Sequence, residues 1–172
     1  MRVWTIGHGT RPVAELIETL RAAHVETLVD VRRFPGSRRN PQFNRPALAA
    51  MLADVGISYV HAADLGGRRS GVEGEERFGC LRVAAFASYA AWMSSPAWQR
   101  ALASTLALPR PCLMCAETLP WRCHRRLIAD LLVVRGHEIV HLIGPGNALP
   151  HRPFAEAESR AGELYLCGER VA

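Results

Sequence analysis

The sequence predicts an α/β fold: one three-layer, Rossmann-like domain over residues 1–172, built on a mainly parallel five-stranded sheet. Short apolar segments alternate along the chain with longer segments whose apolar residues recur at helical spacing. This alternation is typical of parallel strands joined by crossover helices. The 172 residues, of which 49% are hydrophobic and 22% charged, suit one folded domain with its own hydrophobic core.

Each expected element follows from its local pattern. Val13, Leu16, Ile17 and Leu20 repeat at i, i+3, i+4 and i+7, the stripe of an amphipathic helix. The expected strands are residues 3–6, 27–31, 57–60, 111–115 and 138–143. The expected helices are approximately residues 13–20, 46–55, 83–93, 97–106 and 121–135. The family resemblance described below ends at about residue 143, and the tail, residues 144–172, is expected to be loop-rich.

Composition narrows the class of protein and its partners. The net charge is +5, from 21 basic and 16 acidic residues, and every basic residue is arginine. No apolar run approaches the roughly 18 residues that a membrane-spanning helix requires. The N-terminus has the pattern of a strand and turn rather than a secretory signal, so we expect a cytoplasmic protein without membrane contact. Five cysteines, an odd number without an export signal, favour reduced thiols over a disulfide framework.

Candidate binding residues follow the expected strands, because ligands of parallel α/β sheets bind beyond the carboxyl ends of the strands. His8 stands in a glycine-flanked turn before a helix, where it either contacts an anion or serves as a structural hydrogen-bonding group. The segment 32–45 contains five arginines, two phenylalanines and no acidic residue. It is either a solvated basic loop or an element in which arginines bind phosphate while Phe34 and Phe43 stack on bases.

The residues predicted to bind the anion are Arg32, Arg33, Ser37, Arg38, Asn40, Asn44, Arg68 and Arg125. Asp30, at the end of the second strand, is expected to orient one of these arginines. Arg38 lies in a loop that contains two prolines, so we expect it to contribute more to binding than Arg100, which lies in an expected helix.

Cys115 is the candidate nucleophile. It ends the fourth expected strand, before a loop that leads to a helix, which is where rhodaneses and cysteine phosphatases place their thiolate. The sequence therefore predicts a partly accessible thiol with a lowered pKa. The spacing to Arg122 is C-x6-R rather than the C-x5-R of phosphatases, and the loop contains no glycine. His8, His124 and Glu117 are the candidate proton carriers, and Glu117 has the alternative role of accepting hydrogen bonds from loop amides.

A zinc site is a further possibility that the strand assignment argues against. Cys112 and Cys115, with the adjacent Cys123 and His124, supply four potential ligands. Side chains three apart on a strand point to opposite faces, however, so Cys112 and Cys115 are not expected to converge. We therefore expect no metal ion and no cofactor, with Cys112 as a buried core thiol.

Several motifs together resemble a known family. They are residues 5–9 (TIGHG), 29–32 (VDVR), 34–44 (FPGSRRNPQFN), 65–67 (LGG), 115–117 (CAE) and 123–125 (CHR). The string resembles the bacterial family catalogued as domain of unknown function 488, to which the YeaO-like proteins are related. The resemblance extends from the first strand to about Ile143. It implies a Rossmann-like domain and no particular activity, and its motif positions include most of the residues named above, together with Cys123.

These observations lead to three functional hypotheses. The first is an enzyme that acts on an anionic, phosphate-bearing substrate, a nucleotide or a nucleic acid, through an arginine clamp and Cys115. The alternative is a nucleic-acid-binding module without catalysis that uses the same arginines. A third hypothesis is a sulfur carrier that holds a persulfide on Cys115.

Overall fold

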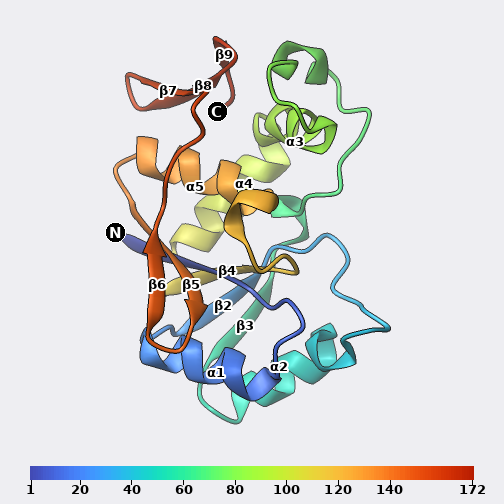
Figure 1. Cartoon of the computed structure of the whole chain (residues 1–172), viewed down its shortest axis with the longest axis vertical. Coiled ribbons are helices and arrows are strands. Elements are labelled where there is room, and N and C mark those ends of the chain that lie inside the picture. Colours follow the sequence, from blue (N-terminus) through green and yellow to red (C-terminus); the bar gives the residue numbers. More distant parts are fainter.

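Six strands form the central sheet of the computed structural model, which describes residues 1–172 (Figure 1). Their order is β3-β2-β4-β1-β5-β6, and all neighbouring pairs are parallel except β5 and β6. The strands are β1 (Arg2–Gly7), β2 (Thr27–Asp30), β3 (Ser58–His61), β4 (Pro111–Cys115), β5 (Glu138–Gly144) and β6 (Asn147–Pro150). The fold is thus α/β with a mostly parallel sheet, as predicted, and it has one strand more than expected.

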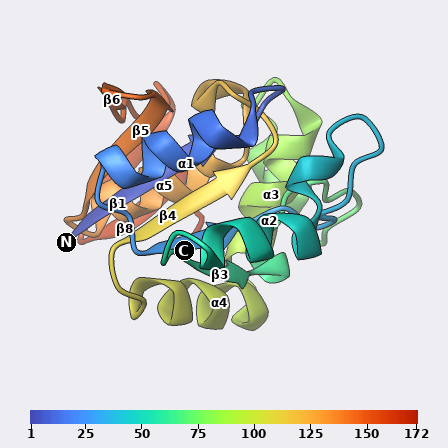
Figure 2. The same cartoon turned by 90° about the horizontal axis from the view of Figure 1, so that it is seen from below.

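Helices cover both faces of the sheet (Figure 1). On one face α1 (Val13–Ala22) and α2 (Arg45–Ala53) pack against the sheet through a cluster of 13 buried residues. On the other face lie α3 (Ala84–Met93), α4 (Pro96–Leu106) and α5 (Arg125–Val134), which contribute to a cluster of 25. Figure 2 shows β4 running between α1 and α2 when the molecule is seen from below. None of the helices combines the length and the apolar character needed to cross a bilayer.

Short 3-10 helices occupy the connections that approach the carboxyl ends of the strands. They are η1 (Pro41–Phe43), η2 (Ala63–Leu65), η3 (Glu75–Phe78) and η4 (Pro120–Arg122). The helix expected from residue 121 therefore begins later, at Arg125, because Cys123 is extended (φ −127°, ψ 146°) and separates η4 from α5.

The tail, residues 144–172, contains four strands, so the expectation that it is loop-rich is wrong. Besides β6, it forms a three-stranded antiparallel sheet of β7 (Ala157–Arg160), β8 (Glu163–Leu166) and β9 (Glu169–Arg170). Leu164 and Leu166 alternate along β8 and join the larger core cluster. This alternation with period two is a strand signal that the prediction of a loop-rich tail overlooked.

Cys80 and Cys167 form a disulfide, with their Cα atoms 5.6 Å apart. The expectation that all five cysteines are reduced thiols is therefore wrong. An odd cysteine count argues against a complete disulfide framework but does not exclude a single bond between two loops. This bond ties the segment before α3 to the C-terminal sheet.

The connections that follow two neighbouring central strands, β1 and β4, run to opposite faces of the sheet. β1 leads into α1 on one face, whereas the adjacent β4 leads into α5 on the other (Figure 1). A crevice is expected where connections from adjacent parallel strands diverge in this way. Gly7 and Cys115 are register partners at the ends of these two strands, so the crevice opens beside them.

A series of hydrogen-bonded polar side chains lies buried between β1, β5 and α5. Thr5 Oγ1 donates to His141 Nδ1 (2.7 Å), His141 Nε2 donates to His151 Nδ1 (2.9 Å), and His151 Nε2 donates to Asp130 Oδ1 (2.7 Å). Burial, with repulsion from His151 and Arg125, lowers the pKa of His141 to about 3. His141 is therefore neutral in the folded protein at neutral pH.

We predict that the free energy of unfolding decreases as the pH falls, because His141 takes up a proton in the unfolded chain but not in the folded protein. Below its ordinary pKa the unfolded chain binds a proton on this histidine that the folded chain does not, so the free energy of unfolding should drop by about 2 kcal/mol between pH 7.5 and pH 5 on this account. Urea unfolding across that range should show a steeper pH dependence for the wild type than for His141→Asn. Equal slopes for the two proteins would contradict the assignment.

Candidate functional site

A pocket of about 290 Å³ lies at the carboxyl ends of β1, β2 and β4. It brings together most of the residues predicted from the sequence, which come from four separate connections. Those that line it are His8, Arg32, Arg33, Ser37, Asn40, Arg68, Cys115, Glu117 and His124. Asn44, Arg38 and Arg125 are the predicted site residues that do not line the pocket.

Arg32 is held rigidly by Asp30, as expected for a strand-end carboxylate. Arg32 Nε donates to Asp30 Oδ1 (2.8 Å) and Nη2 donates to Oδ2 (2.5 Å), and both side chains are buried. Arg32 Nη2 also donates to the carbonyl of Phe43 (2.7 Å), and Tyr59 donates a further bond to Asp30 (2.6 Å). The charge of Arg32 is thus already compensated by Asp30, and its guanidinium also holds the carbonyl of Phe43 in place.

His8 is a neutral hydrogen-bonding group. Its Nδ1 donates to the carbonyl of Gly9 (2.8 Å), which leaves Nε2 to accept from Arg32 Nη1 (3.2 Å). Burial lowers the pKa of His8 to about 4, and the nearby guanidinium of Arg32 contributes to the shift. The ring stacks on Phe43, with ring centroids 4.3 Å apart. Because Phe43 is fully buried, the expectation that it stacks on a base is wrong.

The arginine-rich segment divides into structural and exposed positions. Asn44 Oδ1 accepts from the backbone N–H of Ser37 (2.5 Å), and Ser37 Oγ accepts from the N–H of Asn40 (3.1 Å), so these side chains shape the loop. Arg38 is exposed and lies away from the pocket. Arg33 and Arg68 line the pocket as exposed side chains without a carboxylate partner, and Arg33 Nη1 donates to the carbonyl of Arg68 (3.2 Å).

Glycines allow the connections to meet. A Cβ atom at Gly7 would lie 1.9 Å from the carbonyl oxygen of Glu117, and one at Gly67 would lie 2.7 Å from His124 Nδ1. The loop after β1 also extends the strand pairing, since the N–H of His8 donates to the backbone carbonyl of Cys115 (2.9 Å). The absence of a side chain at Gly7 lets the loop after Cys115 approach β1, and its absence at Gly67 lets the connection after β3 approach His124.

Cys115 differs from expectation in its electrostatics. Its thiol is 5% exposed, donates to Glu117 Oε2 (3.0 Å) and lies 3.9 Å from His124 Nδ1. The nearby sulfur of Cys123, burial and the carboxylate of Glu117 all raise the pKa of Cys115. The prediction of a partly accessible thiol with a lowered pKa is therefore wrong, because the buried thiol lies beside Cys123 and Glu117, which both disfavour its ionisation.

Cys123, which the sequence singles out only as a potential zinc ligand and a family-motif position, lies beside Cys115 and Arg125. Burial opposes its ionisation, but the neighbouring thiol of Cys115 and the positive charge of Arg125 lower its pKa. Arg125 Nε donates to Cys123 Sγ (3.3 Å), and His124 Nδ1 lies 3.6 Å from the same sulfur. The consecutive residues Cys123, His124 and Arg125 form a recognisable motif in the sequence. The motif does not show that the chain folds this segment back onto Cys115.

Arg125 lies behind the pocket and does not line it. It is almost fully buried, and besides Cys123 it donates to Thr5 Oγ1 (3.1 Å) and to the carbonyl of Glu117 (2.5 Å). Its role as a binding residue stays a prediction. Cys112 behaves as expected, since it is fully buried in the smaller core cluster, on the face of the sheet opposite to Cys115.

A larger cavity of about 510 Å³ lies elsewhere, between η4, α5 and the β5-β6 hairpin. Arg126, His141, His151 and Arg152 contribute its polar lining, and neither a cysteine nor a carboxylate reaches it. It offers positive charge without a nucleophile. The smaller pocket is therefore the better candidate for chemistry.

The family model described as domain of unknown function DUF488 matches residues 12–132. The chain belongs to this family. The DUF488 match includes the arginine-rich segment, Cys115, Cys123 and Arg125, whereas β1 with His8 precedes it and β5 to β9 follow it. No curated protein and no solved structure gives a significant match to the chain.

Within this DUF488 protein, we predict that Gly7→Ala destabilises the fold while Gly36→Ala does not. The added methyl group at position 7 overlaps the Glu117 carbonyl, which should cost about 1–3 kcal/mol of unfolding free energy. At Gly36 a Cβ atom meets nothing within 4 Å, so the change should be within about 0.5 kcal/mol. Chemical denaturation of the two variants checks this, and equal stabilities would contradict the close approach of the two connections.

Proposed function

We propose that this protein is an enzyme that acts on an anionic, phosphate-bearing substrate, a nucleotide or a nucleic-acid end, with Cys115 as its nucleophile. The observation that carries the proposal is the position of Cys115 Sγ, the one cysteine sulfur on the pocket wall, 3.0 Å from a carboxylate. A thiol with a proton acceptor in hydrogen-bond contact is the minimal arrangement for nucleophilic catalysis. A rhodanese-like placement of Cys115 at the end of a central strand belongs to the same proposal.

The positive charge available to a substrate comes from Arg33 and Arg68. Both residues line the pocket, and neither forms an ion pair with a carboxylate, so a bound phosphate does not have to displace one. Arginine binds phosphate through paired, charge-assisted hydrogen bonds. Ser37 and Asn40 lie at the same wall and supply neutral polar groups.

The proposed reaction uses Glu117 as the proton carrier. The proton of the Cys115 thiol passes to Glu117 Oε2, and the sulfur forms a bond to the electrophilic atom of the substrate as the bond to the leaving group breaks. Glu117 then returns the proton to the leaving group. In the second step water loses a proton to Glu117 and bonds to the same substrate atom as the bond to sulfur breaks, and that proton regenerates the Cys115 thiol. His124, whose Nδ1 is 3.9 Å from the sulfur, is the second group able to carry a proton.

The test of the proposal is turnover by Cys115→Ser. Wild-type protein is incubated with a panel of nucleoside phosphates and end-phosphorylated oligonucleotides, with product analysis and intact mass measurement after acid quenching. We expect a substrate-derived adduct on Cys115, and a loss of turnover by about a thousandfold or more in the variant. Cys112→Ala, on the opposite face of the sheet, should retain activity. Unchanged turnover in Cys115→Ser would overturn the proposal.

A second candidate function, nucleic-acid binding without catalysis, is favoured by one observation. Phe34 is 61% exposed, and the guanidinium carbon of Arg33 lies 5.2 Å from the centre of its ring. Arg38 and Arg39 are exposed in the same segment. An exposed aromatic ring among guanidinium groups is what stacking on a base and binding of the adjacent phosphates require.

Binding titrations with a short single-stranded oligonucleotide distinguish the two candidates. A pure binding module should lose about tenfold or more in affinity on Phe34→Ala and Arg38→Ala, and bind more weakly as salt rises. The catalytic proposal expects Arg68→Ala to have the largest effect, because Arg68 lines the pocket and Arg38 does not. Arg100→Ala, an exposed change on α4, is the matched control and should have little effect in either case.

A further inference from the structure

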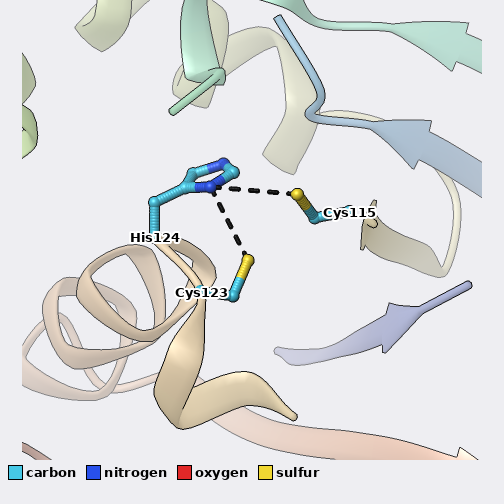
Figure 3. Close-up of side chains that lie close together, drawn as sticks. All are labelled: Cys115, Cys123 and His124. Atoms are coloured by element: carbon cyan, nitrogen blue, oxygen red, sulfur yellow. Dashed lines mark hydrogen bonds between the residues drawn. The ribbon is translucent and has the colours of Figure 1, made fainter. Parts of the chain in front are cut away.

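Three buried ligand-type side chains converge at the pocket from two segments of the chain. Cys115 ends β4, whereas Cys123 and His124 come from the turn before α5, and Figure 3 shows the imidazole of His124 facing both sulfurs. Their sulfur and nitrogen atoms all lie within 4.8 Å of one another. Thiolate sulfur and imidazole nitrogen are the ligands that Zn²⁺ prefers.

The spacing of these atoms matches that of ligands around a single zinc ion. Tetrahedral coordination with Zn–S bonds of about 2.3 Å and Zn–N bonds of about 2.0–2.1 Å places sulfur and nitrogen about 3.6 Å apart. His124 Nδ1 lies 3.6 Å from Cys123 Sγ and 3.9 Å from Cys115 Sγ. Both sulfur–nitrogen distances are therefore within a few tenths of an ångström of the spacing in a zinc site.

The charges around the cluster also suit a divalent cation. Glu117 Oε2 lies 3.0 Å from Cys115 Sγ and places a carboxylate beside the cluster. Two thiolates and one carboxylate carry three negative charges, and Zn²⁺ with the buried guanidinium beside Cys123 carries three positive charges. A metal ion would therefore leave this buried group of side chains electrically neutral.

We propose that Cys115, Cys123 and His124 bind one Zn²⁺ ion per chain and leave its fourth position open. The set differs from the one that the sequence suggested and then disfavoured, because Cys112 lies on the other face of the sheet and takes no part. Zinc binding goes beyond the proposed function and competes with it. A Cys115 sulfur bound to zinc is no longer a free nucleophile, so the ion would inhibit covalent catalysis.

The test uses Co²⁺ as a spectroscopic probe of the full-length reduced protein and Zn²⁺ as its competitor, under anaerobic conditions. We expect one Co²⁺ per chain, with the strong visible bands of a tetrahedral site and a sulfur-to-cobalt charge-transfer band. Zn²⁺ should displace the cobalt. A wild-type titration without these features would overturn the proposal irrespective of any variant or activity.

Variants assign the ligands. Cys123→Ser and His124→Asn should each weaken zinc binding by more than about a hundredfold, beyond the effect usual for a merely supporting residue. Cys112→Ala should bind normally, as should the double variant Cys80→Ser/Cys167→Ser, which removes the thiols that reduction of the disulfide releases. Loss of binding in either control, or its retention in Cys123→Ser, would contradict the assignment. Because the readout is metal binding, it is independent of whether the catalytic proposal holds.

Discussion

The rest of the site depends on the hydrogen bonds that the buried guanidinium of Arg125 donates. It joins β1 through Thr5, the Cys115 loop through the carbonyl of Glu117, and the start of α5 through Cys123. No carboxylate pairs with it, so the sulfur of Cys123 is its negatively polarised partner in a dry environment. A buried charge with three fixed acceptors holds these segments in one arrangement, which places the thiol of Cys115 at the pocket.

Strand order then decides where the pocket opens. β1 and β4 are neighbours whose connections leave on opposite faces, and Gly7 allows the loop after Cys115 to come close enough to close the gap. The ion pair between Asp30 and Arg32 stabilises the connection after β2, and Arg32 also holds His8 through a single hydrogen bond. Arg33 and Arg68 remain as exposed, unpaired cations at the pocket. Rigid, neutralised groups thus surround a small set of groups that are free to bind.

Much of this could be predicted from the sequence, since strand ends in a parallel sheet converge whatever their order. Strand positions and the pocket residues His8, Arg32, Cys115 and Glu117 follow from that rule. The burial of each side chain does not follow from that rule. Phe43 and Arg125 are buried, although the sequence predicts that both contact a ligand. Cys123 and the Cys80–Cys167 disulfide depend on contacts between distant segments, and no local pattern shows them. The short strands of the tail were missed because turns separate them closely.

The central claim is that the pocket beside Cys115 is the anion site of this protein. The most direct test is a crystal structure of the protein with tungstate, an oxyanion of phosphate-like shape whose heavy atom locates it without ambiguity. We expect the anion in the pocket, in contact with the guanidinium groups of Arg33 or Arg68 and adjacent to Cys115 Sγ. Tungstate in the larger cavity beside Arg126 and Arg152, with none in the Cys115 pocket, would contradict the account.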